Sequence, residues 1–180
     1  MAEEKKKKQK AKTGFLPVLC SGLGTAILLL VIAIFIPLTV PRLFGYEIYH
    51  VVSGSMAPAI PTGSAVFVQP CPPESVQTQE VIAFDSGGSV VTHRVVKNRI
   101  VEGDFVTKGD ANAIEDIESV PYRALIGRVK VHVPFLGTAM ALVASPIGKL
   151  YLLLFACCGV MFNLLGDRIR YNRSQESGDR

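Results

Sequence analysis

Residues 81–96 read Val81-Ile82-Ala83-Phe84-Asp85-Ser86-Gly87-Gly88-Ser89-Val90-Val91-Thr92-His93-Arg94-Val95-Val96, two short apolar runs on either side of a glycine-rich turn. Runs rich in β-branched residues are typical of strands, and the segment Asp85–Ser89 is suited to a hairpin connection. The sequence therefore predicts two strands, Val81–Phe84 and Val90–Val96, joined by a tight turn.

Further stretches of the same kind lie on both sides of this hairpin, separated by turn residues and without an internal repeat or a sizeable amphipathic helix. They are Glu47–Val52, Ala65–Gln69, Phe105–Lys108 and Ile126–Val133. We expect a mainly β domain over residues 45–132, closed as a small barrel or a pair of sheets. Because such a domain has a modest core, we expect it to be supported by its anchor or by a membrane surface.

The segment before this domain is long and apolar. Between Thr13 and Pro41 the only ionisable side chain is the thiol of Cys20. A bilayer core of about 30 Å needs about 20 helical residues, so residues 15–41 are predicted to form a transmembrane anchor that ends near Pro37 and Pro41. No small-x-small cleavage site follows before Arg42, so we expect the anchor to be retained.

A second apolar region follows the domain, between Val133 and Gly166. Residues 149–166 are predicted to form a second transmembrane helix. Residues 133–148 form a membrane-proximal apolar segment, either an interfacial patch or part of a longer span.

Basic residues gather at the two ends of the chain, in the tails 1–14 and 167–180. This distribution predicts that both tails are cytoplasmic and that the middle of the chain is exported. The segment 45–132 holds ten Asp or Glu against seven Lys or Arg, so the formal net charge of +4 comes from the flanks. The charge therefore indicates topology rather than binding to nucleic acid.

Cysteines are also divided between the regions. Cys20, Cys157 and Cys158 lie in apolar segments, which leaves Cys71 alone in the exported part. We expect no internal disulfide there, and for Cys71 a loop or packing role rather than a catalytic one.

The motif Ser53-Gly54-Ser55-Met56-x-Pro58 places a candidate nucleophile, Ser55, at the expected end of a strand. Serine is a weak nucleophile, so catalysis requires a base and donors that stabilise an oxyanion. Gly54 would allow a tight turn, and the Ser53 hydroxyl could serve as one such donor. Taken alone, Ser-Gly-Ser is usually a loop.

The candidate base is His93, because a polar pair, His93-Arg94, interrupts an otherwise apolar strand and imidazole titrates near neutral pH. His50 competes, but its odd spacing from Ser55 would place the two on opposite faces of a regular strand. His132 is expected to be structural.

An orienting carboxylate is expected from the segment Thr107–Asp116, where Asp110 and Asp116 both qualify. One would hold the imidazole in the correct tautomer and the other would stabilise the loop. A calcium-binding EF-hand is disfavoured because Ile114 occupies a ligand position and Glu115 replaces the required glycine.

Taken together, Ser-Gly-Ser-Met-x-Pro, Gly63-Ser64, His93-Arg94 and Thr-Lys-Gly-Asp-Ala-Asn resemble type I signal peptidases, in particular the Ser-His subgroup of the endoplasmic reticulum, archaea and some Gram-positive bacteria. The resemblance covers roughly Val51 to Asp116. It implies a signal-peptidase-like β-barrel or sheet domain, flanked by transmembrane helices, that removes signal peptides from secretory precursors after small residues.

The resemblance also implies roles for individual residues. Ser55 would be the nucleophile, His93 the base, and Asp116 the catalytic acid with Asp110 in support, although the two aspartates could be exchanged. Ser53 would be an oxyanion donor and Met56 part of the oxyanion and substrate-binding segment, whereas Asp104 is a weaker candidate. No metal or other cofactor is expected.

The resemblance implies an integral protein of the plasma membrane, or of the endoplasmic reticulum in a eukaryote, with secretory precursors, the lipid bilayer and export machinery or companion subunits as partners. Two other functions remain open. One is a self-cleaving regulator of a related fold, which normally uses a lysine base and a DNA-binding domain. The other is a catalytically inactive, membrane-anchored module that binds precursors.

Overall fold

The computed structural model describes residues 15–178, without the side chains of Leu38, Ser174 and residues 176–178. The predicted tail 1–14 and the last two residues of the predicted tail 167–180 lie outside the described residues. The chain divides into two compact units. One contains the β domain, Pro37–Ser145, and the other contains the apolar helices up to Ile36 and from Pro146 onward.

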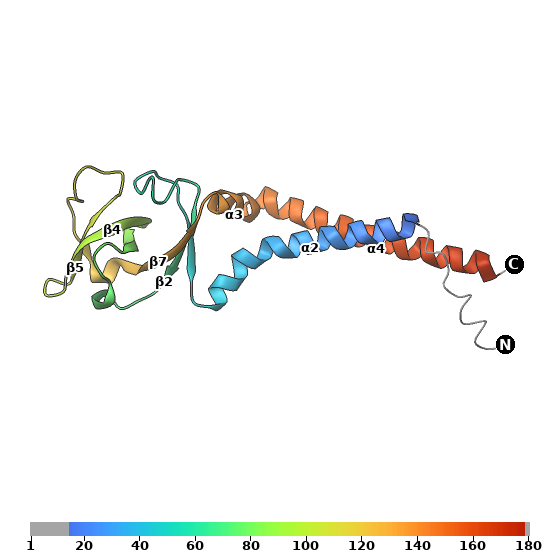
Figure 1. Ribbon diagram of the computed structural model, residues 1–180, viewed down its shortest axis with the longest axis horizontal. Coiled ribbons are helices and arrows are strands. Elements are labelled where there is room, and N and C mark those ends of the chain that lie inside the picture. The colour runs from blue at the N-terminus through green and yellow to red at the C-terminus, as the bar shows by residue number, and fades with distance from the viewer. Residues whose placement is uncertain (1–14, 179–180) are drawn as a thin grey trace. The chain divides into compact units, whose positions relative to one another are not determined.

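The β domain is built on an antiparallel sheet of seven strands in the order β1-β2-β7-β3-β4-β5-β6. Strands β2, β4, β5 and β7 are labelled in Figure 1. The strands are β1 Glu47–His50, β2 Ala65–Gln69, β3 Val81–Ser86, β4 Ser89–Arg99, β5 Asp104–Lys108, β6 Val120–Pro121 and β7 Leu125–Val133. Two short 3₁₀ helices, η1 Pro73–Ser75 and η2 Tyr122–Ala124, lie in the connections. The expectation of a mainly β domain is confirmed.

The predicted hairpin forms as expected, since β3 and β4 pair in register from Val81↔Arg94 to Ser86↔Ser89. Each predicted strand is present: Ala65–Gln69 has the predicted bounds, and the ends of the others differ by up to three residues. The two-residue strand β6 was not predicted because it is too short to carry a periodic pattern.

The first four residues of strand β3, Val81–Phe84, are apolar because both faces of this part of the strand are buried or half-buried. Ala83 packs into one core cluster, with Val51, Met56, Ile60, Val66 and Val68. Ile82 and Phe84 pack into a second cluster, with Val76, Val95, Phe105 and Val120. Alternate residues of a strand point to opposite faces, so this central strand joins two cores across the sheet.

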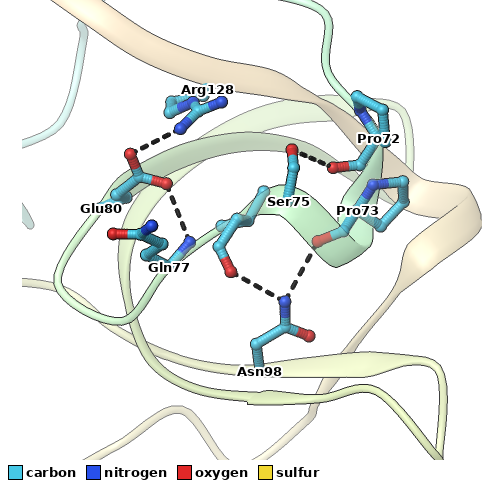
Figure 2. Close-up of polar contacts among 8 residues, drawn as sticks. Pro72, Pro73, Ser75, Gln77, Glu80, Asn98 and Arg128 are labelled. Carbon is cyan, nitrogen blue, oxygen red and sulfur yellow. Dashed lines mark hydrogen bonds and ion pairs between the residues drawn. The ribbon is translucent and has the colours of Figure 1, made fainter.

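The connection from β2 to β3 is tied to the sheet by side chains (Figure 2). The Asn98 amide on β4 donates to the carbonyl oxygens of Pro73 and Val76 at 3.1 and 2.8 Å. Arg128 on β7 donates to Glu80 at 2.7 Å, and the second oxygen of Glu80 accepts the backbone N–H of Gln77. This irregular segment is therefore fixed against β4 and β7.

Helix α2, Phe15–Leu43, continues through Pro37 and Pro41, so these prolines do not end it as the sequence suggested. The helix is instead terminated at Gly45, which has a φ of 76°. Its N–H donates to Arg42 O, and the N–H of Tyr46 donates to Pro41 O, both at 3.1 Å. This pair of bonds satisfies the free carbonyls at the helix end, and the positive φ favours glycine.

The apolar segment after β7 forms a separate helix, α3 Leu136–Ala144, which packs against the sheet through Gly137. Helix α4, Pro146–Gly178, begins three residues before the predicted second span and ends twelve residues after it. Ser145 between them has a ψ of 155°. Because a residue that precedes proline is disfavoured in the helical region, Pro146 both interrupts the first helix and starts the second.

Two helices of residues 15–178 are long and apolar enough to cross a membrane, within Phe15–Pro37 and Pro146–Arg173. Their apolar windows are only 6% and 11% buried, unlike the core helices of soluble proteins. The two helices lie side by side (Figure 1), and the Thr25 hydroxyl lies 3.2 Å from Asn163 Oδ1. A Cβ atom added at Gly24 would meet the Gly159 carbonyl at 2.6 Å, so glycine allows the close approach.

Candidate active site

The Ser55 segment is a turn and not the end of a strand, because β1 stops at His50. The turn is closed by two backbone bonds, from Ala57 N to Gly54 O at 3.0 Å and from Ile60 N to Met56 O at 2.8 Å. The Met56 side chain is 1% exposed and belongs to the first core cluster. The buried methionine thus anchors the turn and leaves Ser55 half-buried beside it. Since the whole residue is 1% exposed, the Met56 side chain is part of the core and lines no surface open to a ligand.

Hydrogen-bond donors near Ser55 are left unused. In the described part of the chain, the backbone N–H groups of Ser55 and Met56 donate to no protein acceptor. The exposed Ser53 hydroxyl lies 3.3 Å from the Ser55 hydroxyl. An oxyanion, which forms on the substrate's carbonyl oxygen beside the nucleophile, requires free donors of this kind.

Gly54 does not use the conformational freedom of glycine. Its φ lies outside the positive range, and an added Cβ would meet only Thr62 Oγ1, at 3.8 Å. The tight turn expected at Gly54 is present, closed by the bond from Ala57 N to Gly54 O, but its geometry does not require glycine at this position.

His93 lies on β4 opposite Ile82, and its ring packs edge-on against Phe84 with a centroid separation of 6.2 Å. Its Nδ1 is 2.5 Å from Asp116 Oδ2. An ionised carboxylate can only accept hydrogen bonds, so Nδ1 would donate in this contact, and in a neutral imidazole Nε2 then presents a lone pair. This is the tautomer that a general base needs.

Asp116 is itself held at two points by Thr107 on β5. The Thr107 hydroxyl donates to the same carboxylate oxygen, Oδ2, at 2.7 Å. The backbone N–H of Asp116 donates to the Thr107 carbonyl at 2.8 Å. The carboxylate is thereby fixed toward the His93 ring.

Asp110 has a different partner. Its two oxygens accept Nε and Nη2 of Arg94 at 2.8 and 2.6 Å, and Arg94 also donates to the Gln79 carbonyl. This bidentate guanidinium lowers the pKa of Asp110 below its usual 3.8, and the charges of His93 and Lys108 contribute less. Asp110 is therefore ionised and engaged with arginine, whereas Asp116 is the aspartate in contact with the imidazole.

The loop between Gly109 and Asp116 reaches both halves of the site. The Ser55 carbonyl accepts the N–H of Ala111 at 2.9 Å, and the other end of the loop carries the Asp116 carboxylate. Within residues 15–178, no hydrogen bond joins the Ser55 hydroxyl to the His93 ring. The structure brings His93 and Asp116 into contact and ties Ser55 to the same loop through its backbone.

A cleft of about 670 Å³ adjoins the His93–Asp116 pair. Phe84 and Val91 form an apolar wall. Asp85, Asp116, Glu118 and Arg123 also line the cleft, and Ser55 is not among the lining residues. The cleft could hold an extended peptide on the side of the imidazole.

The other candidates have separate surroundings. The His50 Nε2 lies 3.4 Å from the Thr138 hydroxyl on α3, and His132 is an exposed residue of β7. Asp104 accepts two hydrogen bonds from Arg99. Cys71 is half-buried in the loop after β2, with no disulfide.

Sequence reasoning treated two polar residues only as parts of motifs. Arg94 was half of the polar pair that marked the strand, and Thr107 was the first residue of the acidic segment. Thr107 follows buried Phe105 by two positions, which places both side chains on one face of β5. A polar residue at an inward position of a strand was the available signal.

Comparison with known proteins gives one region of clear similarity. Over 81 residues the chain is 41% identical to Signal peptidase I W of Bacillus subtilis (strain 168), a match that covers 42% of each protein. The chain thus matches less than half the length of this relative. No family model matches the chain. The similarity to this relative supports a relation to the type I signal peptidase family.

Proposed function

We propose that this protein is a membrane-bound serine endopeptidase of the Ser-His subgroup, which removes N-terminal signal peptides from exported precursors after small residues. The observation that carries the proposal is the 2.5 Å contact between His93 Nδ1 and Asp116 Oδ2, on a loop that also binds the Ser55 carbonyl. The similarity to Signal peptidase I W and the two apolar helices support it.

In the proposed reaction, the Ser55 hydroxyl attacks the carbonyl carbon of the scissile peptide bond and His93 Nε2 takes its proton. Asp116 stabilises the imidazolium that results. The tetrahedral intermediate collapses when His93 returns the proton to the leaving amine, which leaves an ester on Ser55. Water, activated by the same imidazole, then hydrolyses the ester.

The negative charge that develops on the substrate oxygen needs donors that are not already used. The free N–H groups of Ser55 and Met56 and the hydroxyl of Ser53 are suited to that role. The buried Met56 side chain would contribute by holding the turn in place. Asp110, paired with Arg94, would keep the loop in shape.

The proposed topology has two spans, α2 and α4, with both chain ends in the cytoplasm and the β domain outside it. The site would face the plasma membrane surface, or the lumen of the endoplasmic reticulum in a eukaryote, where precursors arrive from export machinery. A protease added to intact cells should leave a tag at either end intact. Digestion of either tag would contradict this topology.

The test is cleavage of a precursor panel by the purified full-length protein in detergent, with each cut located by mass spectrometry. We expect cuts after small residues and no cleavage by Ser55→Ala. His93→Ala and Asp116→Asn should each lower kcat by about 10⁴-fold, as in other serine triads. Unchanged cleavage by Ser55→Ala would reject the serine mechanism, and near-normal rates in the other two would reject the roles of His93 and Asp116.

The alternative is a catalytically inactive module that binds precursors. It is favoured by the absence, in residues 15–178, of a hydrogen bond between Ser55 and His93, and by the position of Ser55 outside the cleft lining. A protein that retains precursors in a pull-down but cuts none of the panel would support this alternative.

A further inference from the structure

The Thr107 side chain has no contact with solvent, with an exposed fraction of 0%. It lies on β5 opposite Val95, two positions from His93 on the neighbouring strand. Residues that face one another across antiparallel strands share a face of the sheet. Thr107 and His93 therefore point to the same side, and Asp116 reaches both of them.

The hydroxyl of Thr107 has a side-chain partner. A buried threonine hydroxyl most often donates to a nearby backbone carbonyl, whereas this one donates to Asp116 Oδ2 at 2.7 Å. That same oxygen is 2.5 Å from His93 Nδ1. Two donors thus converge on one carboxylate oxygen, and a rotation of the carboxylate would break both contacts.

The backbone strengthens this arrangement. Since the Asp116 N–H donates to the Thr107 carbonyl at 2.8 Å, one residue fixes both the main chain and the side chain of Asp116. A valine would fill nearly the same volume and keep the backbone bond. The hydroxyl is needed only for its hydrogen bond to the carboxylate.

We propose that Thr107 is a positioning residue of the site, which acts through Asp116 to hold the His93 ring in the orientation and tautomer of a general base. The role rests on the proposed peptidase function. Thr107 touches no reacting atom, so it contributes by keeping the carboxylate oxygen pointed at Nδ1. Small errors in the placement of a catalytic group are costly in rate.

The first experiment compares variants of the full-length protein in the precursor cleavage assay. Thr107→Val should lower kcat by about ten- to hundredfold with little change in KM, and Thr107→Ser, which keeps the hydroxyl, should stay within about threefold of the wild type. The matched control is Thr92→Val, the same change on β4 at a position whose hydroxyl makes no hydrogen bond within residues 15–178. Its rate should stay close to that of the wild type.

A double-mutant cycle with Asp116→Ala separates positioning from general destabilisation. If Thr107 acts through Asp116, Thr107→Val should cause no further loss once the carboxylate is gone. Equal losses in both backgrounds, full activity of Thr107→Val, or failure of Thr107→Ser to retain activity would overturn the proposal. Thermal unfolding of each variant in detergent shows whether it is folded at the assay temperature.

A spectroscopic readout keeps the test independent of turnover. The His93 Nδ1 proton, held between nitrogen and carboxylate, should give a downfield proton resonance that Thr107→Val shifts or broadens and Thr107→Ser preserves. If the wild type cleaves nothing, or Asp116→Ala retains full activity, the proposed function fails and this resonance alone decides the positioning contact. A resonance unchanged by Thr107→Val would overturn the contact as well.

Discussion

Replacement of Gly109 by alanine tests how closely the acidic loop supports the nucleophile. Gly109 is buried, and a Cβ atom at this position would lie 2.7 Å from the Ser55 carbonyl oxygen and 2.8 Å from Asn112 Nδ2. Its φ is outside the positive range, so alanine causes no backbone strain there. The effect of the substitution is therefore steric, and it acts on the backbone of Ser55.

The size of the effect follows from these contacts. To reach ordinary contact at 3.4 Å from 2.7 Å, the loop and the Ser55 carbonyl must separate by about 0.7 Å. The bond from Ala111 N to Ser55 O, at 2.9 Å, would lengthen as well. A misplacement of about 1 Å at a reacting group can cost about 10²-fold in rate, so we expect Gly109→Ala to lower kcat by roughly ten- to hundredfold.

The assay is single-turnover cleavage of a precursor by the detergent-solubilised protein, with thermal unfolding measured in parallel. Gly54→Ala is the comparison, because its methyl group would meet only Thr62 Oγ1 at 3.8 Å. It should lose several-fold less activity than Gly109→Ala, although it is closer to Ser55 in sequence. Wild-type kcat in a folded Gly109→Ala protein would refute the view that this loop positions the nucleophile.

Three further predictions concern other parts of the molecule. Because the folded-state pKa of Asp110 lies below 3.8, its contribution to stability is present above that pH and is lost as the pH falls through the lowered value. Asp110→Asn should therefore lower the unfolding temperature at pH 7. It should also make the unfolding temperature depend less on pH below about 4. An unchanged unfolding temperature at pH 7 would contradict this. Gly24→Leu should separate the apolar helices and lower the thermal midpoint in detergent. Gly22→Leu is the control and should leave the midpoint unchanged, because a Cβ atom at Gly22 meets nothing within 4 Å. Equal midpoints for the two variants would contradict the packing. Ser53→Ala should lower kcat by about 10²- to 10³-fold with little effect on KM if its hydroxyl stabilises the oxyanion, and a change in KM alone would assign it to ground-state binding.

The strands were predictable because their pattern is local. Alternation and turn residues located the β3–β4 hairpin from sixteen consecutive residues, but the strands pair further into the expected turn Asp85–Ser89, as far as Ser86 and Ser89. The order of the strands was not predictable, because it depends on pairings between distant segments such as β2 with β7. A single curved sheet and a pair of sheets have the same local pattern.

The helix ends show how one local signal can compete with another. Pro37 and Pro41 suggested a stop that the structure does not make, while Gly45, the residue that accepts a positive φ, ends the helix. Pro146 does act as a boundary, because it begins α4 and constrains Ser145 before it. Ile36 and Val40 also precede prolines and are helical, so a proline in the next position does not by itself end a helix, although it disfavours the helical region for the residue before it.

In the candidate site, residue types were predictable and partners were not. The sequence placed a histidine and two aspartates in the right segments, but either aspartate could have met the imidazole. The outcome depends on Arg94, which binds both oxygens of Asp110 and leaves Asp116 to His93. The roles of Ser55 as nucleophile and His93 as base stay predictions.

The most direct test of the central claim is the separation of Ser55 Oγ and His93 Nε2 in an experimental structure with a non-cleavable precursor peptide bound. Catalytic hydrogen bonds often tighten only when substrate is present. We expect the two atoms at about 2.6–3.2 Å, with the peptide carbonyl against the free N–H groups of Ser55 and Met56. A bound peptide with these two atoms too far apart for a direct contact, or for one bridged by a single water, would contradict the proposed mechanism.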